Sequence, residues 1–251
     1  MDIAIITGAS SGIGVEFYKE MQKEKLDQVW VIARRKEKLD EICQKYGKIA
    51  HRVLPFDITE QSSLKQLSEI LEAEKPNVRF LFNNAGFGIW GSVLDSDYES
   101  QGKMVRLNVQ ALTEITSIVV KYMSKGACII NTCSIASFVP NAYMSVYSAT
   151  KAYVLSFTKS LRYELRKHKI NVTAICPGPM ATEFLDVAGL DKGVSRAFDK
   201  LPYCDPNKTA VKGIKAAKKK KCVYTPRVFY KFYRVIAKML PHSMLMGLSK
   251  T

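Results

Sequence analysis

Tyr147 and Lys151 stand four residues apart, and Ser134 precedes Tyr147 by thirteen residues. A tyrosine phenol has an ordinary pKa of about 10, so it transfers protons poorly near neutral pH unless a cation stabilises the phenolate. On a helix, this spacing places Lys151 on the same face as Tyr147. A serine from a separate strand could then hold a substrate oxygen close to the phenol. The three residues therefore predict an acid–base site that acts on a substrate oxygen.

The same Tyr-x-x-x-Lys spacing recurs at Tyr163 and Lys167, so the spacing alone does not identify the site. Tyr163 lies in residues 161–166, whose amphipathic helical pattern indicates a packing residue. Ser134 follows a predicted strand and can face Tyr147 across a crevice. We therefore assign the site to Tyr147.

A glycine-rich segment, residues 7–14, follows an apolar run at residues 3–6 and leads into a helical pattern. Gly8 permits a tight turn, Gly12 lets the backbone approach a pyrophosphate, and Gly14 allows close packing of helix and strand. The start of the helix would offer unpaired N–H groups to the phosphates. A strand, a glycine turn and a helix in this order predict a dinucleotide-binding unit.

The residues after the second predicted strand indicate which dinucleotide is bound. Arg34 and Arg35 stand there, where a unit that prefers NAD would place an acidic residue for the ribose 2′-hydroxyl. A guanidinium suits a 2′-phosphate, so we predict NADP(H), with Arg34 as the main contact and Ser10 or Ser11 adding a hydrogen bond. The alternative is that the two arginines merely begin a solvated basic helix.

Further motifs follow in order: Asp57, the run Asn83-Asn84-Ala85-Gly86, Asn108 and the pair Pro177-Gly178. With the glycine loop and the Ser-Tyr-Lys set, the chain resembles the classical short-chain dehydrogenase/reductase family from about residue 3 to about residue 226. The residues expected to contact the cofactor, from the motifs and the resemblance, are Gly8, Ser10, Ser11, Gly12, Ile13, Gly14, Arg34, Asp57, Asn84, Ala85, Gly86, Tyr147, Lys151, Pro177, Gly178 and Thr182.

The resemblance also implies a mechanism with four catalytic residues. A hydride passes between the nicotinamide and the carbonyl carbon of the substrate. Tyr147 would donate its proton to the carbonyl oxygen and act as the base in the reverse direction. Ser134 would polarise that oxygen. Lys151 would lower the pKa of the phenol and hold the nicotinamide ribose, and Asn108 would fix a water that relays protons to Lys151.

The length of 251 residues and a hydrophobic fraction of 47% suit one domain with a sizeable core. Apolar runs predict strands at about 3–6, 29–33, 52–54, 79–83, 127–132, 171–175 and 222–225. Because helical patterns alternate with them, we predict an α/β fold: a single-domain, Rossmann-like, doubly wound parallel sheet with helices on both faces. Residues 1–226 would form the NADP-binding and catalytic domain with a lid at about 180–202, and residues 227–251 a helical extension of it.

Apolar and aromatic side chains near the predicted site favour a bulky hydrophobic carbonyl or alcohol as the substrate. They are Phe87, Ile89, Trp90, Ile135, Phe138, Val139, Tyr143 and Met144, with Phe184, Leu185, Val187, Leu190, Val194 and Phe198 in the lid. We favour a steroid-like ligand, as in hydroxysteroid dehydrogenases; a 3-oxoacyl thioester is the alternative. A non-catalytic NADP-binding regulatory protein is an alternative of another class, which the presence of the complete Ser-Tyr-Lys set disfavours.

Composition limits the other functional classes. The chain has 38 Lys and Arg against 23 Asp and Glu, a formal charge of +15, without a nucleic-acid-binding motif. We therefore expect a solubilising surface and no nucleic-acid partner. Met1 almost directly precedes the first strand, so we expect no secretory signal and a cytoplasmic protein. The six cysteines lack Cys-x-x-Cys spacing and are expected to be buried thiols, and no metal site is expected.

The C-terminal segment has apolar residues at helical spacing over 227–240 and basic residues on another face. Such a helix can pack on its own subunit, cover the substrate mouth or join subunits of a homodimer or homotetramer. We favour these protein contacts as a group, because surface helices are ordinarily amphipathic. Weak peripheral contact with an anionic membrane is the alternative.

Overall fold

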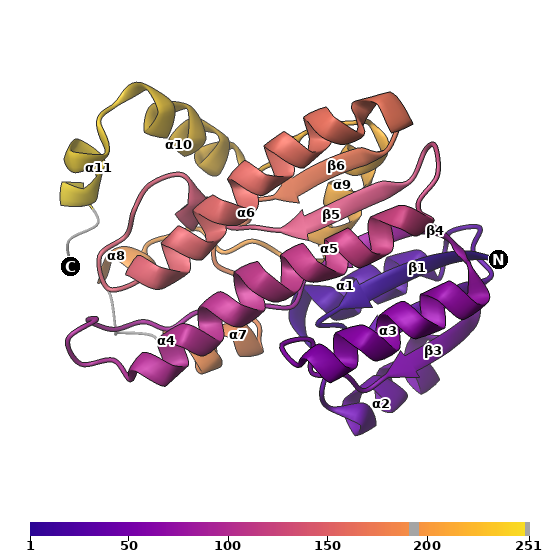
Figure 1. The fold of residues 1–251 in the computed structure, drawn as a ribbon. Coiled ribbons are helices and arrows are strands. Elements are labelled where there is room, and N and C mark those ends of the chain that lie inside the picture. Colours follow the sequence, from indigo (N-terminus) through magenta and orange to yellow (C-terminus); the bar gives the residue numbers. More distant parts are fainter. Residues whose placement is uncertain (191–195, 249–251) are drawn as a thin grey trace.

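The computed structural model describes residues 1–190 and 196–248. Its strands form one sheet in the order β3-β2-β1-β4-β5-β6-β7, and every neighbouring pair is parallel (Figure 1). The strands are β1 (Asp2–Thr7), β2 (Gln28–Ile32), β3 (Ala50–Leu54), β4 (Asn77–Asn83), β5 (Cys128–Thr132), β6 (Asn171–Ile175) and β7 (Val223–Tyr224). All seven predicted strands are present, and the predicted doubly wound parallel sheet is confirmed. Residues 191–195 of the predicted lid, including Val194, lie outside the described residues.

Helices cover both faces of this sheet (Figure 1). They are α1 (Gly12–Met21), α2 (Lys36–Tyr46), α3 (Gln61–Glu74), α4 (Tyr98–Val105), α5 (Leu112–Val119), α6 (Ser145–Glu164), α7 (Glu183–Ala188), α8 (Arg196–Asp199), α9 (Pro206–Lys218), α10 (Val228–Met239) and α11 (His242–Leu248). Shorter helical turns are η1 (Arg106–Ala111, a π turn), η2 (Val120–Tyr122), η3 (Ile135–Ser137) and η4 (Leu165–His168).

Two apolar cores, one on each face of the sheet, hold these layers together. Ala4 and Ile6 of β1 pack into the core under α1, α2 and α9, whereas Ile3 and Ile5 pack into the core under α3 and α5. Successive side chains of a strand point to opposite faces, so a strand covered on both sides is a continuous apolar run. This is why apolar runs mark the central strands, whereas the edge strands β3 and β7 are only partly buried.

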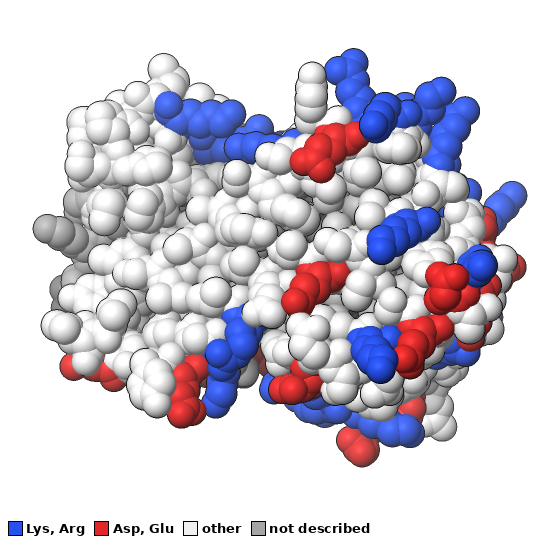
Figure 2. Space-filling model, viewed as in Figure 1, with Lys and Arg blue, Asp and Glu red and all other residues white. Residues whose placement is uncertain are grey.

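Charged side chains are spread unevenly over the surface. In the view of Figure 2, they gather over α3, α5 and the end of α6 that lies away from α10. The surface over α10 and α11 consists mainly of uncharged side chains, with Lys and Arg along its edge. None of the helices in the described part of the chain is long and apolar enough to cross a bilayer.

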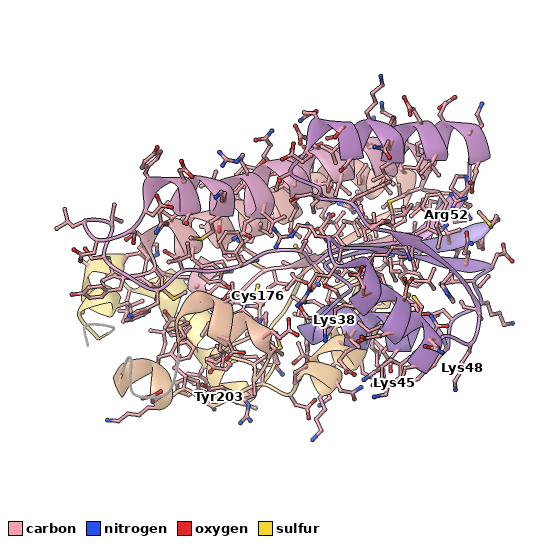
Figure 3. The ribbon with its side chains drawn as sticks, turned by 90° about the horizontal axis from the view of Figure 1, so that it is seen from below. Lys38, Lys45, Lys48, Arg52, Cys176 and Tyr203 are labelled. Atoms are coloured by element: carbon pink, nitrogen blue, oxygen red, sulfur yellow. The ribbon has the colours of Figure 1, made fainter. Side chains whose placement is uncertain are left out.

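All six cysteine thiols are free, and five of them are buried; Cys222 is half-buried. Figure 3 places Cys176 in the interior of the molecule. The thiols therefore belong mainly to the packed core.

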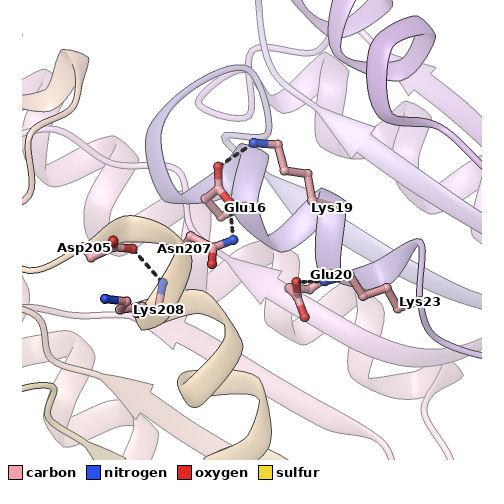
Figure 4. Close-up of polar contacts among 7 residues, drawn as sticks. All are labelled: Glu16, Lys19, Glu20, Lys23, Asp205, Asn207 and Lys208. Carbon is pink, nitrogen blue, oxygen red and sulfur yellow. Dashed lines mark hydrogen bonds and ion pairs between the residues drawn. The ribbon is translucent and has the colours of Figure 1, made fainter.

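Polar contacts join the first helix to a helix near the C-terminus on the same face of the sheet (Figure 4). Asn207 Nδ2 of α9 donates to Glu16 Oε2 of α1 at 2.7 Å. Asp205 begins α9 by accepting a hydrogen bond from the backbone N–H of Lys208 at 2.8 Å, and proline follows at the first helical position. These contacts fix α9 beside α1.

The carboxyl ends of the parallel strands meet at one edge of the sheet, where the strand order reverses between β1 and β4. Thr7 joins these two strands: its Oγ1 donates to the Phe82 carbonyl at 3.1 Å and accepts from the N–H groups of Asn84 at 2.9 Å and Ala85 at 3.1 Å. Ligands of open α/β sheets bind at such a switch point.

Candidate active site

A cavity of about 1300 Å³ opens at this edge of the sheet and extends from the β1–α1 turn to α10. Single small ligands occupy cavities of about 300–1,000 Å³, so this cavity can hold a dinucleotide together with a substrate. Every predicted site residue lines it except Gly14 and Asn108.

The glycine loop forms one end of the cavity. Gly8 and Gly12 have φ values of +64° and +54°, in the left-handed region that glycine adopts most readily. Gly14 lies behind the loop, where a Cβ atom would stand 2.1 Å from the Gly8 carbonyl oxygen. Helix α1 begins at Gly12, and the Ser11 side chain before it makes no capping hydrogen bond. The first N–H groups of α1 are thus available to an anionic ligand such as a pyrophosphate.

Arg34 and Asp57 lie side by side at the same end. Arg34 Nη1 is 3.9 Å from Asp57 Oδ2, and the arginine side chain is largely exposed. Asp57 Oδ1 also accepts hydrogen bonds from the N–H of Thr59 at 3.0 Å and from its hydroxyl at 2.7 Å. Asp57 therefore stabilises a turn and also lines the cavity. The exposed Arg34 guanidinium is accessible to a phosphate group.

Arg35 has different partners from Arg34. Its Nη2 donates to Glu183 Oε2 of α7 at 2.8 Å and to Ser10 Oγ of the glycine loop at 3.4 Å. This contact joins the turn after β2 to α7. Sequence analysis missed Glu183, because 148 residues separate it from Arg35 and no local pattern relates the two.

The predicted Asn-Asn-Ala-Gly motif ties three strand ends together. Asn84 Nδ2 donates to the carbonyl oxygens of Thr7 and Gly8, each at 3.1 Å, and Asn84 Oδ1 accepts from Thr132 Oγ1 at 3.0 Å. The ends of β1, β4 and β5 are thus held at fixed separations below the cavity.

Asn108 lies buried in the π turn η1, behind the cavity wall. Its Nδ2 donates to the Phe87 carbonyl at 2.8 Å and to Thr150 Oγ1 of α6 at 3.1 Å, while its Oδ1 accepts from the Phe87 N–H at 3.1 Å. A Cβ atom on Gly86 would stand 2.8 Å from Asn108 Oδ1 and 3.5 Å from Lys151 Nζ. Gly86 therefore lies next to both Asn108 and Lys151. The water-relay role of Asn108 stays a prediction.

Tyr147, Lys151 and Ser134 converge at the middle of the cavity. Tyr147 and Lys151 lie on the buried face of α6, and Lys151 Nζ is 5.7 Å from the centre of the Tyr147 ring. Lys151 Nζ also donates to the Thr132 carbonyl at 2.9 Å. Ser134, two residues after β5, lines the cavity beside Tyr147, and its Oγ accepts the N–H of Ala136 at 3.1 Å.

Burial controls the protonation of this group of residues. It raises the pKa of Tyr147 well above the ordinary value, and the influence of the neighbouring Ser134 hydroxyl offsets only part of that rise. Burial also lowers the pKa of Lys151. In the protein alone, burial thus outweighs the predicted effect of Lys151 on the phenol. At neutral pH Tyr147 carries its proton, the form that can donate to a carbonyl oxygen.

The second Tyr-x-x-x-Lys copy lies away from the cavity. Tyr163 is 79% exposed, so the prediction that it is a packing residue was wrong. It follows Tyr147 by sixteen residues on α6, and at about 100° per residue this turns its side chain by about 160° to the opposite face. The same rotation removes it from Ser134.

The other end of the cavity is apolar. Of the predicted wall residues in the described part of the chain, those that line it are Phe87, Trp90, Ile135, Met144, Phe184, Leu185, Val187, Leu190 and Phe198. Ile89, Phe138, Val139 and Tyr143 do not line it; Phe138 and Val139 pack in a core beside α10 instead. Helix α10 adds wall residues that sequence analysis did not assign, although its helical apolar spacing was visible: Val228, Phe229, Tyr230, Phe232, Tyr233 and Ile236.

Two buried thiols lie beneath the site, and sequence analysis did not pair them. Cys133 and Cys176 immediately precede Ser134 and Pro177 at the ends of neighbouring strands, and both thiols are buried. Cys133 Sγ also donates to the Lys151 carbonyl at 3.2 Å. Burial alone would raise the pKa of Cys133, but its hydrogen bonds and the Lys151 charge lower it to about 7. The register of β5 and β6 brings these thiols together.

Comparison with known proteins agrees with this geometry. A model described as short chain dehydrogenase matches residues 2–192. An uncharacterized oxidoreductase from Staphylococcus epidermidis is 29% identical over 205 residues, which span 81% of this chain and 87% of that protein. A short-chain dehydrogenase from Sphingobium yanoikuyae, solved in complex with NADPH, is 26% identical with a TM-score of 0.80, covering 98% of this chain and 96% of that one. A bulky-bulky ketone specific alcohol dehydrogenase from Comamonas testosteroni is 25% identical with a TM-score of 0.77, covering 98% and 94%.

Proposed function

The chain belongs to the short chain dehydrogenase family, and we propose that it is an NADP(H)-dependent oxidoreductase that interconverts a carbonyl and a secondary alcohol on a bulky hydrophobic substrate, such as a steroid-like ketone. One observation carries this proposal. Tyr147 and Ser134 both line the cavity, where its glycine-loop end meets its apolar end. A carbonyl bound there would lie within reach of both hydroxyl groups.

The residues at the glycine-loop end fit NADP(H). The N–H groups at the start of α1 would hold the pyrophosphate, and the exposed guanidinium of Arg34 would bind the 2′-phosphate. Lys151 would hold the nicotinamide ribose and Thr182, which precedes α7, would face Gly12. The bound cofactor supplies or accepts the hydride. The NADPH complex of the Sphingobium relative supports this choice.

The acid–base work would fall to the residues of this chain. Ser134 Oγ already accepts a backbone hydrogen bond from Ala136, which leaves its hydroxyl hydrogen to donate to the substrate oxygen. Tyr147, held protonated by burial, would deliver its proton to that oxygen. The ammonium of Lys151 would then stabilise the phenolate.

The apolar end favours a bulky substrate. Its walls come from separate segments, including the turn after Gly86, α7 and α10, so a large rigid molecule could be enclosed on several sides. The Comamonas relative, which is specific for bulky-bulky ketones, supports this substrate class.

Replacing Tyr147 tests the proton donor. We expect Tyr147→Phe to lower the kcat of ketone reduction by at least about a hundredfold, because a positioned acid contributes about 10²–10⁴-fold to the chemical step. NADPH affinity, measured by fluorescence titration, should change little. Tyr163→Phe is the matched control on the exposed face of α6 and should retain full activity. A Tyr147→Phe enzyme with near wild-type kcat would contradict the assignment.

A substrate panel tests the proposed chemistry. NADPH oxidation would be followed with ketosteroids, bulky diaryl ketones, 3-oxoacyl thioesters and small sugars. Turnover highest with the bulky ketones is the expected result; preference for the thioesters would favour the 3-oxoacyl reductase alternative. Tight NADPH binding without reduction of any carbonyl would favour a non-catalytic regulatory protein.

A further inference from the structure

Helix α10 is fastened to the body of the protein by one narrow face. Its buried residues are Tyr230 and Ala237. The Tyr230 hydroxyl donates to the Pro202 carbonyl at 2.9 Å, and a Cβ atom on Gly178 would stand 2.2 Å from the Tyr230 ring. The helix is thus held in a fixed orientation against the turn that follows β6.

The opposite face of α10 is apolar and open to solvent. Its exposed large apolar residues, which continue beyond the helix, are Val228, Phe229, Phe232, Val235, Ile236, Met239, Leu240 and Met244. Positions 228, 232, 235 and 239 form a single stripe at helical spacing. The predicted packing of this segment onto its own subunit therefore does not cover the stripe. Soluble proteins rarely leave such a contiguous apolar surface without a partner.

This apolar face is continuous with the cavity. Phe229, Phe232 and Ile236 are exposed to solvent and also line the cavity. Whatever covers α10 therefore sits at the mouth of the proposed substrate site.

The charges around the stripe select the kind of partner. Residues 206–251 contain twelve Lys and Arg and no Asp or Glu, and Lys231 and Lys238 belong to α10 itself. Figure 2 shows Lys and Arg at the edge of the uncharged surface over α10 and α11. If a second copy packed α10 against α10, these lysines would face one another without an acidic residue of the segment to pair with them. An anionic bilayer satisfies both features, since it buries the apolar stripe and attracts each nearby Lys or Arg by about 1 kcal/mol.

We infer that the apolar face of α10 docks on an anionic membrane surface and presents the cavity mouth to the bilayer, so that a hydrophobic substrate enters from the lipid. The entry of substrate rests on the proposed function, whereas membrane docking does not. The substrate class would then be a membrane-dissolved ketone or alcohol, with its apolar body passing between α10 and α7.

The test measures co-sedimentation of the full chain with vesicles of phosphatidylcholine alone and of phosphatidylcholine mixed with phosphatidylserine. We expect binding to the mixed vesicles that weakens as salt is added, because salt screens the lysines. The double variant Val235→Glu with Met239→Glu alters residues that are 53% and 77% exposed and lie outside the cavity lining. It should bind at least about tenfold more weakly, since it removes two apolar side chains from the lipid contact.

The matched control is Val93→Glu with Leu94→Glu. It makes the same change in charge at residues that are 60% and 94% exposed in the loop before α4. It should bind the mixed vesicles as the wild type does, and a circular dichroism spectrum checks that both variants fold. The docking inference would be overturned if the wild-type chain did not co-sediment with the mixed vesicles. Equal losses of vesicle binding in the two variants would also overturn it. So would a dimer, seen by sedimentation velocity, that the α10 variant alone abolishes.

Activity separates this inference from the proposed function. The wild-type enzyme should reduce a steroid ketone embedded in mixed vesicles faster than one in phosphatidylcholine vesicles. Vesicle binding without reduction of any ketone would refute the proposed function and leave docking in place. Reduction of a dissolved ketone without vesicle binding would refute docking and leave the function in place.

Discussion

At the scale of single residues, the two arginines after β2 differ although they are neighbours in sequence. Arg34 makes one long ion pair with Asp57 and is otherwise open to the cavity, whereas Arg35 is engaged by Glu183 and Ser10. A guanidinium that already donates to two partners has fewer free N–H groups to offer a phosphate. Arg34 is therefore the better candidate for the 2′-phosphate, and Arg35 is better placed to hold α7 against the glycine loop.

Cofactor preference tests this difference. We expect Arg34→Ala to lower the ratio of kcat/KM with NADPH to kcat/KM with NADH by about tenfold to a hundredfold, because a hydrogen-bonded charge contributes about 1.5–3 kcal/mol. Arg35→Ala should change the ratio less. Lys38→Ala is the control, since Lys38 lies on α2 (Figure 3) and outside the cavity lining. Equal loss with both cofactors in Arg34→Ala would contradict the phosphate role.

At the scale of elements, the site depends on how closely α1 approaches the turn before it. Gly14 faces the Gly8 carbonyl so directly that no side chain fits between them. The contact is to the backbone, which cannot rotate away as a flexible side chain can. The position of α1 relative to β1 therefore depends on residue 14 having no Cβ atom. The direction of the N–H groups offered to a phosphate depends on it too.

Thermal or urea unfolding of Gly14→Ala tests this contact. We expect a loss of about 1–3 kcal/mol in the free energy of unfolding, as overpacked sites show, together with weaker NADPH binding. Gly102→Ala is the matched control, because Gly102 lies within α4 and its nearest contact is 3.5 Å away on the flexible side chain of Arg106. That change should leave the protein unchanged or stabilise it by up to about 1 kcal/mol. Similar destabilisation in both variants would argue against a special contact at Gly14.

At the scale of the whole molecule, burial of tyrosine makes the fold sensitive to alkali. Burial raises the pKa of several tyrosines, namely Tyr18, Tyr147, Tyr224, Tyr230 and Tyr233. Between the unfolded value of about 10 and the higher folded value, the unfolded chain has lost a proton that the folded chain keeps. Stability is therefore unaffected by these groups below about pH 10 and falls as pH rises above it.

Urea unfolding across the alkaline range checks this sign. The free energy of unfolding should fall by up to about 1.4 kcal/mol per pH unit for each such tyrosine. Tyr147→Phe should show a slope shallower by about one proton above pH 10. The lowered pKa of Lys151 has the opposite effect on stability. Between its folded value and about pH 10.5 the unfolded chain holds a proton that the folded chain has lost, so the free energy of unfolding rises with pH there. An unchanged slope in Tyr147→Phe would contradict the raised pKa.

Several features of this protein follow from the order of residues within short stretches of the chain. Strands buried on both faces must be apolar runs, the loop at Gly8 and Gly12 requires left-handed backbone, and helical spacing places Lys151 beside Tyr147. Which faces point inward and which distant residues meet depends on the folded molecule. Folding turned Tyr163 to solvent, brought Glu183 to Arg35, extended the cavity to α10 and raised the pKa of Tyr147. These outcomes depend on burial and on contacts between residues far apart in the chain, neither of which a local pattern contains.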